Sequence, residues 1–382
     1  MLTLLDAPNE HYYDPSTGTL YYQPNSTDSA NPAPPPATLA LAAPTLMTLL
    51  RVNATQANPL KGLTLQGIGF RDAAPTFLEP HGIPSGGDWA LERMGALFFE
   101  GTTNLKISGC DFVRNDGNGV MLSGFNRFAS IVGNHFAWTG DTAIAAWGRT
   151  DELSDNGIHG WDGTGGDFPW HTLVESNVIR ETGVWEKQSS CWFQAKTAQT
   201  VLKGNICFNL GRAGFNFNDG FGGGDWVYQN LIFNTNRESA DHGPINSWDR
   251  QPYVTTVATG KPSGKMLPRN ITNNFMVANY GGSNGAVDND DGSEYYENNH
   301  NFQIYGHQKF KVGAIHSYGN VMAYVSGYGE KWKAAGNIPT DPNTMHDNIV
   351  VFAPSDTPRA YHSCDAWKAS SKKKRNECTA RV

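Results

Sequence analysis

Short runs of alternating apolar and polar residues recur from about residue 60 to residue 352, and most of them share one arrangement. A β-forming run is followed by a turn residue, usually Asn, and then by a second β-forming run. Apolar side chains stand three positions before the turn residue and two positions after it, so one side of each run faces a core. The turn residues are Cys110, Asn134, Asn177, Asn205, Asn230, Asn274, Asn320 and Asn348.

The spacing of these turn residues predicts a solenoid. The shorter intervals, such as the 24 residues from Cys110 to Asn134, match one rung of three strands. The longer ones contain insertions, and we expect a further rung near Asn301. Asn suits a repeated corner because its side chain bonds to local backbone and tolerates the left-handed conformation. A β-sandwich would not repeat this column at rung length, so we predict an all-β fold, a right-handed parallel β-helix of about nine to ten rungs.

A third strand in each rung changes character along the predicted axis. Counting from the turn residues gives one inward column: Val120, Ile144, Trp192, Phe215, Ile245 and Val287. The two outward columns are Met121, Ala145, Phe193, Asn216, Asn246 and Asp288, and then Ser123, Trp147, Ala195, Asn218, Trp248 and Asp290. This outer face is apolar in the early rungs and rich in Asn, Asp and Trp in three later rungs. A solvated face usually mixes Lys, Thr, Ser and Glu, so we interpret this pattern as a candidate site facing a groove.

Other polar residues flank the same rungs, and hydrolysis of a glycosidic bond would suit their chemistry. They are Asp219, Glu238, Asp241, His242, Asp249, Arg250 and Asp291. Carboxylates packed this densely raise some of one another's pKa values, so a proton donor and an ionised base can coexist. Glycosidases need that pairing. Carboxylates on adjacent rungs, about 4.8 Å apart, would suit a retaining pair, and carboxylates two rungs apart an inverting pair, so both outcomes stay open.

The same residues admit other interpretations. Asp288, Asp290 and Asp291 could bind Ca²⁺ through oxygen ligands, although their spacing is not that of an EF-hand. His242 and Tyr253 could act on a uronate in a lyase or epimerase, with Arg250 pairing with the carboxylate of the sugar. A non-catalytic carbohydrate-binding β-helix is a third alternative. Trp89, in the insertion 81–92, could stack on a sugar ring or pack against the solenoid.

Composition and charge narrow the range of binding partners that the protein is expected to have. The 382 residues include 29 Lys+Arg and 36 Asp+Glu, a formal charge of −7, so nothing indicates nucleic acid binding. No apolar run approaches the roughly 18 residues of a membrane span. The first residues are too short and polar for a signal peptide, so we expect the chain to begin within a longer precursor. We expect a monomer that needs no cofactor.

The sequence predicts one β-helix domain, residues 1–353, and a basic C-terminal tail, residues 354–382. Cys110, Cys191 and Cys207 fall in strand-like runs and are interpreted as small buried hydrophobic residues. Cys364 and Cys378 lie within the tail, on either side of its basic run, and could pair if the protein is secreted. The expected location is extracellular or in the secretory pathway.

Four segments resemble the bacterial and algal β-helix region proteins, and within that group glycoside hydrolase family 141. They are WTGDTAI (138–144), RAGFNFNDGFGGG (212–224), RESADHGPINSWDRQPY (237–253) and VDNDDGS (287–293). The family includes α-L-fucosidases and xylanases, so the resemblance implies hydrolysis of a plant or algal polysaccharide by two Asp residues. Asp249 with Asp290 or Asp291 fits that arrangement best, with Asp219 and Asp241 as alternates. The start of the chain departs from the family, whose members carry further N-terminal β-helix sequence.

Overall fold

The structure, a computed structural model, describes residues 2–24, 41, 43–84, 89–149, 165–218, 222–239, 241–248, 255–256, 261–262, 267–280, 285–310, 314–325 and 343–352. The chain divides into two compact units, Met1–Ala43 and Pro44–Val382. The first contains a 3-10 helix, Leu2–Leu4, and an antiparallel hairpin of β1 (His11–Asp14) and β2 (Thr19–Tyr22). The predicted domain of residues 1–353 therefore begins earlier than the unit that carries the repeats. The predicted tail lies outside the described residues.

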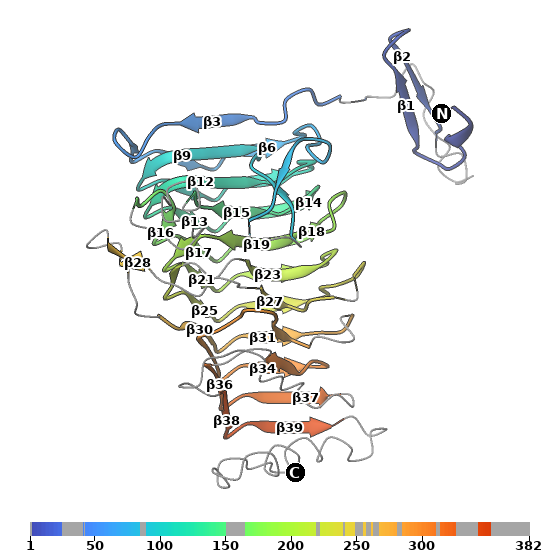
Figure 1. Ribbon diagram of the computed structural model, residues 1–382. Coiled ribbons are helices and arrows are strands. Elements are labelled where there is room, and N and C mark those ends of the chain that lie inside the picture. Colours follow the sequence, from blue (N-terminus) through green and yellow to red (C-terminus); the bar gives the residue numbers. More distant parts are fainter. Residues whose placement is uncertain are drawn as a thin grey trace. The chain divides into compact units, whose positions relative to one another are not determined.

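The second unit consists of three parallel sheets whose strands follow one another rung by rung (Figure 1). The first sheet contains β5 (Thr64–Gln66), β10 (Lys106–Ser108), β13 (Ser130–Val132), β17 (Leu173–Glu175), β21 (Val201–Lys203), β25 (Trp226–Tyr228), β30 (Arg269–Thr272), β33 (Tyr296–Asn299), β36 (Ile315–Tyr318) and β38 (Thr344–His346). The second contains β6 (Gly69–Arg71), β11 (Asp111–Val113), β14 (His135–Thr139), β18 (Val178–Thr182), β22 (Ile206–Phe208), β26 (Leu231–Phe233), β31 (Phe275–Val277), β34 (Phe302–Ile304), β37 (Val321–Val325) and β39 (Ile349–Phe352).

The third sheet carries the predicted site. It contains β3 (Leu50–Asn53), β4 (Leu60–Lys61), β9 (Leu97–Thr103), β12 (Val120–Arg127), β15 (Ile144–Trp147), β16 (Pro169–Trp170), β19 (Ser190–Ala195), β20 (Thr197–Ala198), β23 (Ala213–Asn218), β24 (Gly222–Gly223), β27 (Ile245–Trp248), β32 (Val287–Asn289) and β35 (Gln308–Phe310). Two short antiparallel hairpins lie outside the three sheets: β7 (His81–Gly82) with β8 (Leu91–Glu92), and β28 (Thr255–Thr256) with β29 (Lys261–Pro262).

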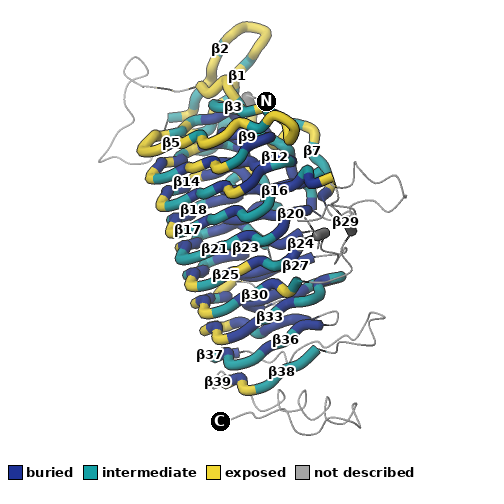
Figure 2. The backbone as a smooth tube through the Cα atoms, turned by 90° about the vertical axis from the view of Figure 1, so that its left-hand side faces the viewer, coloured by how far each residue is buried: buried dark blue, intermediate teal, exposed yellow. Residues whose placement is uncertain are grey.

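The strand register confirms the parallel β-helix solenoid and the predicted third strand. Val120 pairs with Ile144, and the same column continues through Trp192, Phe215, Ile245 and Val287. All six side chains are buried in one hydrophobic cluster. Buried residues run through the length of the stack, and exposed residues gather along its turns (Figure 2). Side-chain alternation along each strand therefore places the neighbouring residues on the outer face.

The predicted Asn column is a continuous hydrogen-bonded ladder. Each Asn from Asn134 to Asn320 donates through Nδ2 to Oδ1 of the next, at 2.8–3.0 Å. The same Oδ1 atoms accept the backbone N–H of the preceding Asn. Asn301 is a member, which confirms the further rung, and Asn348 is the last. The backbone N–H of Cys110 donates to Asn134 Oδ1 at 2.9 Å, so Cys110 occupies the corresponding corner one rung earlier.

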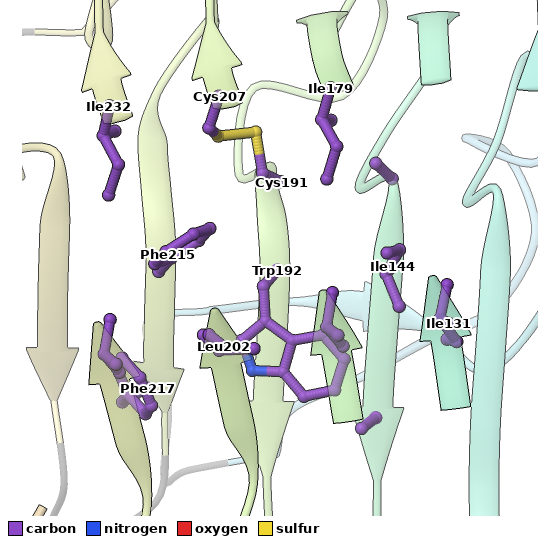
Figure 3. Close-up of a cluster of buried hydrophobic side chains, with 14 of the residues drawn as sticks. Ile131, Ile144, Ile179, Cys191, Trp192, Leu202, Cys207, Phe215, Phe217 and Ile232 are labelled. Carbon is purple, nitrogen blue, oxygen red and sulfur yellow. A yellow bond between two sulfur atoms is a disulfide. The ribbon is translucent and has the colours of Figure 1, made fainter. Parts of the chain in front are cut away.

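A disulfide crosses the solenoid interior and corrects one sequence interpretation. Cys191 of β19 and Cys207 of β22 are bonded to each other next to Trp192 (Figure 3). The interpretation of these two as separate buried hydrophobic residues is wrong, because the third and second sheets face each other across the core at this rung. Cys110 is buried and has a free thiol, as predicted. The pair Cys364 and Cys378 lies outside the described residues.

A second hydrophobic cluster covers the early rungs of the outer face of the third sheet. Trp89 and Leu91, which come from the insertion, pack with a row of outward side chains. That row consists of Phe98, Met121, Ala145, Trp147, Phe193 and Ala195. The insertion therefore lies over the face whose later rungs carry the polar residues. Across the described ranges, no helix has the length and apolar character of a membrane span.

Candidate functional site

Three neighbouring strands bring Asn216, Asn246 and Asp288 into one column, as the sequence predicts. Asn216 pairs in register with Asn246, and Asn246 with Asp288. Asn246 Nδ2 donates to Asp288 Oδ2 at 3.2 Å. All three side chains are fully buried rather than open to solvent, as are the neighbouring Asn218 and, nearly so, Trp248. The predicted residues therefore lie together, beneath a cover rather than along an exposed groove.

The amides of this column are not satisfied by the described residues. Both amide atoms of Asn216 and of Asn218 lack a hydrogen-bond partner, and so does Asn246 Oδ1. Leaving a buried polar group unpaired costs about 1–3 kcal/mol. Such groups persist where a bound molecule or water completes their hydrogen bonds. A row of donors and acceptors at rung spacing therefore suits a ligand rich in hydroxyl groups.

Lys309 joins the two carboxylates at the end of this row. It pairs in register with Asp288, and its Nζ lies 3.0 Å from Asp288 Oδ1 and 3.1 Å from Asp290 Oδ1. Lys309 and Asp288 are buried, whereas the side chain of Asp290 is 17% exposed. The ammonium group stands between the two carboxylates considered as ligands of Ca²⁺. Asp290 is the member of this group that a substrate can reach from solvent.

Burial dominates the electrostatics of Asp288. Removal from water, with a contribution from Asp290, raises the pKa of Asp288 to about 7 although the Lys309 ammonium acts in the opposite direction. An ordinary Asp side chain is fully ionised at neutral pH. The group formed by Asp288, Asp290 and Lys309 therefore keeps a proton through much of the range in which enzymes work.

Asp241 and His242 form a second charged group with Arg212. Nη2 of Arg212 donates to Asp241 Oδ2 at 2.9 Å and lies 3.1 Å from His242 Nε2. Burial, reinforced by Arg212, lowers the pKa of His242 to about 3, so the imidazole is neutral. Burial would raise the pKa of Asp241, but the guanidinium of Arg212, which is charged and donates to Oδ2, outweighs it and the pKa is lowered. Asp241 therefore holds its negative charge more firmly than an ordinary Asp, whereas Asp288 is partly protonated at neutral pH.

Trp89 packs against the solenoid instead of offering a ring to solvent. It is 1% exposed and stacks on His242, with ring centroids 5.5 Å apart, and on Phe193 at 5.7 Å. The guanidinium of Arg212 lies 5.2 Å from the centre of the Trp89 ring. His242 is likewise buried, so it does not stand at the rim of a groove as predicted. The stack fixes the position of His242.

A pair of buried carboxyl groups fastens this insertion to the solenoid. Glu92 of β8 and Asp141 are fully buried near each other, and Thr76 donates to Glu92. Burial and the proximity of Glu92 raise the pKa of Asp141 well above its usual range. Asp141 therefore binds its proton more tightly than an exposed Asp does. This pair was not anticipated from the sequence, although Asp141 belongs to the WTGDTAI segment.

The remaining predicted residues are dispersed or lie outside the described part of the chain. Glu238 forms an exposed ion pair with Lys187 at 2.7 Å. Asp291 is exposed. Asp219, Asp249, Arg250 and Tyr253 are outside the described residues.

Sequence reasoning missed two cations of the site. Arg212 stands three positions before the inward Phe215, as His242 stands three before Ile245, so the register could have placed both at one corner. Lys309 could have been found by extending the outward column one rung beyond Asp288. Among the described residues, no three His, Cys, Asp or Glu side chains are grouped to hold a metal ion.

Comparisons with known proteins support the architecture. No protein-family model and no curated protein sequence matches this chain. A solved structure named "Glycoside hydrolase" is similar with a TM-score of 0.56 and 14% sequence identity, over 87% of this chain. The match covers 57% of the chain of that structure. At this identity the likeness shows a shared fold.

Proposed function

We propose that this chain is a carbohydrate-active enzyme that hydrolyses glycosidic bonds of a plant or algal polysaccharide. The observation that carries the proposal is a row of polar side chains along the third sheet. The buried amides of Asn216 and Asn218, which lack partners among the described residues, lie on β23, which precedes the charged group of Asp288, Lys309 and Asp290. Amides that both donate and accept suit the hydroxyl groups of a sugar. The name of the similar solved structure and the resemblance to glycoside hydrolase family 141 agree with this proposal.

The reaction needs one carboxyl that donates a proton and one that acts as base or nucleophile. In our proposal Asp249 and Asp290 are the catalytic pair, with Asp219 and Asp241 as alternates. Lys309 holds the carboxylate of Asp290 and contacts Asp288 at the same time. Because burial raises the pKa of Asp288 to about 7, this neighbour of Asp290 is partly protonated near neutral pH and places less negative charge beside the proposed catalytic residue.

The alternative of a uronate lyase or epimerase finds less support in the charge distribution. Such an enzyme needs a base able to remove a proton next to a carboxylate. His242 is a weak base because its pKa is about 3, and Nε2 already contacts Arg212 and Asp241. Arg212 already forms an ion pair with Asp241, so its guanidinium is not available to pair with the carboxylate of a uronate. A binding protein without catalysis is the third alternative.

A product assay separates the three. We would incubate the protein with fucosylated, xylan and pectic glycans and measure new reducing ends together with absorbance of unsaturated uronates. The proposal predicts new reducing ends without that absorbance. Unsaturated products would indicate the lyase, and binding without either product would indicate a carbohydrate-binding protein. We also propose a secreted location, because a disulfide such as Cys191–Cys207 persists in oxidising compartments.

A further inference from the structure

Three inward positions of the solenoid change from apolar to polar in a single rung, while Tyr296 and Phe310 of that rung remain in the hydrophobic core. In the rung of β33, β34 and β35, the inward side chains Asn298, Gln303 and Gln308 are all fully buried. One comes from each of the three sheets. Their partners in the preceding rung are Ile271, Met276 and Val287, which belong to the hydrophobic core. We call these three residues, Asn298, Gln303 and Gln308, the amide layer.

The amide layer contains five polar atoms without a partner among the described residues. They are Oδ1 of Asn298 and both amide atoms of Gln303 and Gln308. Asn298 Nδ2 donates to Asn289 Oδ1 at 2.9 Å. Ser317 follows Asn298 in the next rung, in a column that holds Ile, Val or Leu in seven earlier rungs. A small polar side chain therefore replaces a large apolar one beside Asn298, whereas the apolar Met322 follows Gln303.

We propose that the amide layer encloses ordered water molecules inside the solenoid. A cation would satisfy only the amide oxygens and an anion only the NH₂ groups, whereas water both donates and accepts. Buried water is a regular component of protein interiors where at least two polar groups converge and a water molecule fits. The unmet donors and acceptors of Gln303 and Gln308 match that requirement.

The layer is continuous with the backbone that carries the candidate carboxylates. Asn289 Nδ2 donates to Ser247 Oγ at 2.8 Å, and Ser247 Oγ contacts Ser293 Oγ at 2.8 Å. The backbone N–H of Asp290 donates to the Ser247 carbonyl at 2.9 Å. Water in the layer therefore completes a network that holds the turn after Asp288 from behind. The proposal does not depend on the reaction that the outer face performs.

A crystal structure that resolves ordered water tests the proposal. We expect density peaks inside the solenoid at about 2.7–3.2 Å from the amide atoms of Gln303 and Gln308. An interior without such peaks, in which the amides bond to one another, would overturn it.

Two exchanged variants give an independent test in solution. Gln303→Met removes an amide from the layer, and Met276→Gln adds one to the apolar rung before it, in the same column. If water satisfies Gln303, its loss should raise Tm by no more than about 2 °C or should lower it. Met276→Gln should lower Tm by several degrees. That result would show that an unpaired amide at an inward position of this column destabilises the protein. A rise of several degrees in Gln303→Met would mean that a dry, unpaired amide had been removed, and it would refute the proposal.

Discussion

The ammonium group of Lys309 lies 3.0 Å from Oδ1 of Asp288, and both side chains are buried on the outer face of the third sheet. The pKa of Asp288 is nevertheless about 7. The loss of hydration, together with Asp290, therefore outweighs the attraction of the cation. Neutral amides surround the pair instead of water, so the proton state of this group is set by the fold.

Stability should depend on pH through Asp288. The pKa is 3.8 for an unperturbed Asp, as in the unfolded chain, and about 7 for Asp288 in the folded protein. The folded state therefore binds more protons between these two pH values. The stabilisation by the raised pKa is fully present below pH 3.8 and is lost as the pH rises through about 7. The difference corresponds to on the order of 4 kcal/mol. Asp288→Asn removes this pH dependence. The difference in Tm between the variant and the unsubstituted protein should therefore shift in favour of the variant from pH 4 to pH 8, by the amount expected for about one titrating group.

Thermal melts at several pH values would measure this effect, with Asp291→Asn as the matched control. Asp291 is exposed and close in sequence, so its variant should follow the profile of the unsubstituted protein. Parallel profiles for the Asp288→Asn and Asp291→Asn variants would contradict the assignment of the pH dependence to burial of Asp288.

The Asn ladder should be sensitive to a single apolar substitution. Asn205 donates to the Val174 carbonyl and to Asn230, and it accepts from the backbone and side chain of Asn177. Asn205→Leu leaves these buried groups unpaired and should lower the free energy of unfolding by roughly 3 kcal/mol or more. Denaturant titration would measure the loss. Asn53→Leu, at an exposed position of β3, should change it little, and equal effects of the two would argue against the ladder.

The disulfide should stabilise the middle rungs. Replacing both Cys191 and Cys207 by Ala removes a cross-link between residues 16 apart and should cost about 3 kcal/mol of unfolding free energy. Cys110→Ala removes a buried thiol without a cross-link and should cost less. Peptide mapping without reductant should recover the two cysteines in one linked fragment. Recovery of both as free thiols would refute the pairing.

The Asn column could be predicted from sequence because one residue type recurs at one corner and the flanking strands alternate regularly. Asn301 was anticipated for the same reason. Lys309 was missed because β35 has three residues and its first inward position is the polar Gln308, so Phe310 is its one apolar residue. The predicted outward column therefore ends at Asp288, one rung too early.

Contacts between elements could not be derived from periodicity. Cys191 and Cys207 lie on different sheets, and only the cross-section of the solenoid brings them together. The burial of His242 depends on Trp89, whose insertion folds over the outer face. The period of a sequence predicts which face of its own sheet a residue lies on. It does not predict which other elements of the chain pack over that face.

The most direct test of the central claim is turnover of glycan substrate by Asp290→Asn and Asp249→Asn, with circular dichroism to verify folding. Each change keeps the side-chain volume nearly constant, so we expect folded proteins whose rate is lower by about 10²–10⁴-fold, the usual contribution of proton transfer. Asp219→Asn and His242→Ala would be measured alongside, with Asp111→Asn, exposed and paired with His135, as a control that keeps full activity. Activity lost only in His242→Ala would favour the lyase or epimerase. Full activity in the Asp219, Asp249 and Asp290 variants would contradict the proposed hydrolase.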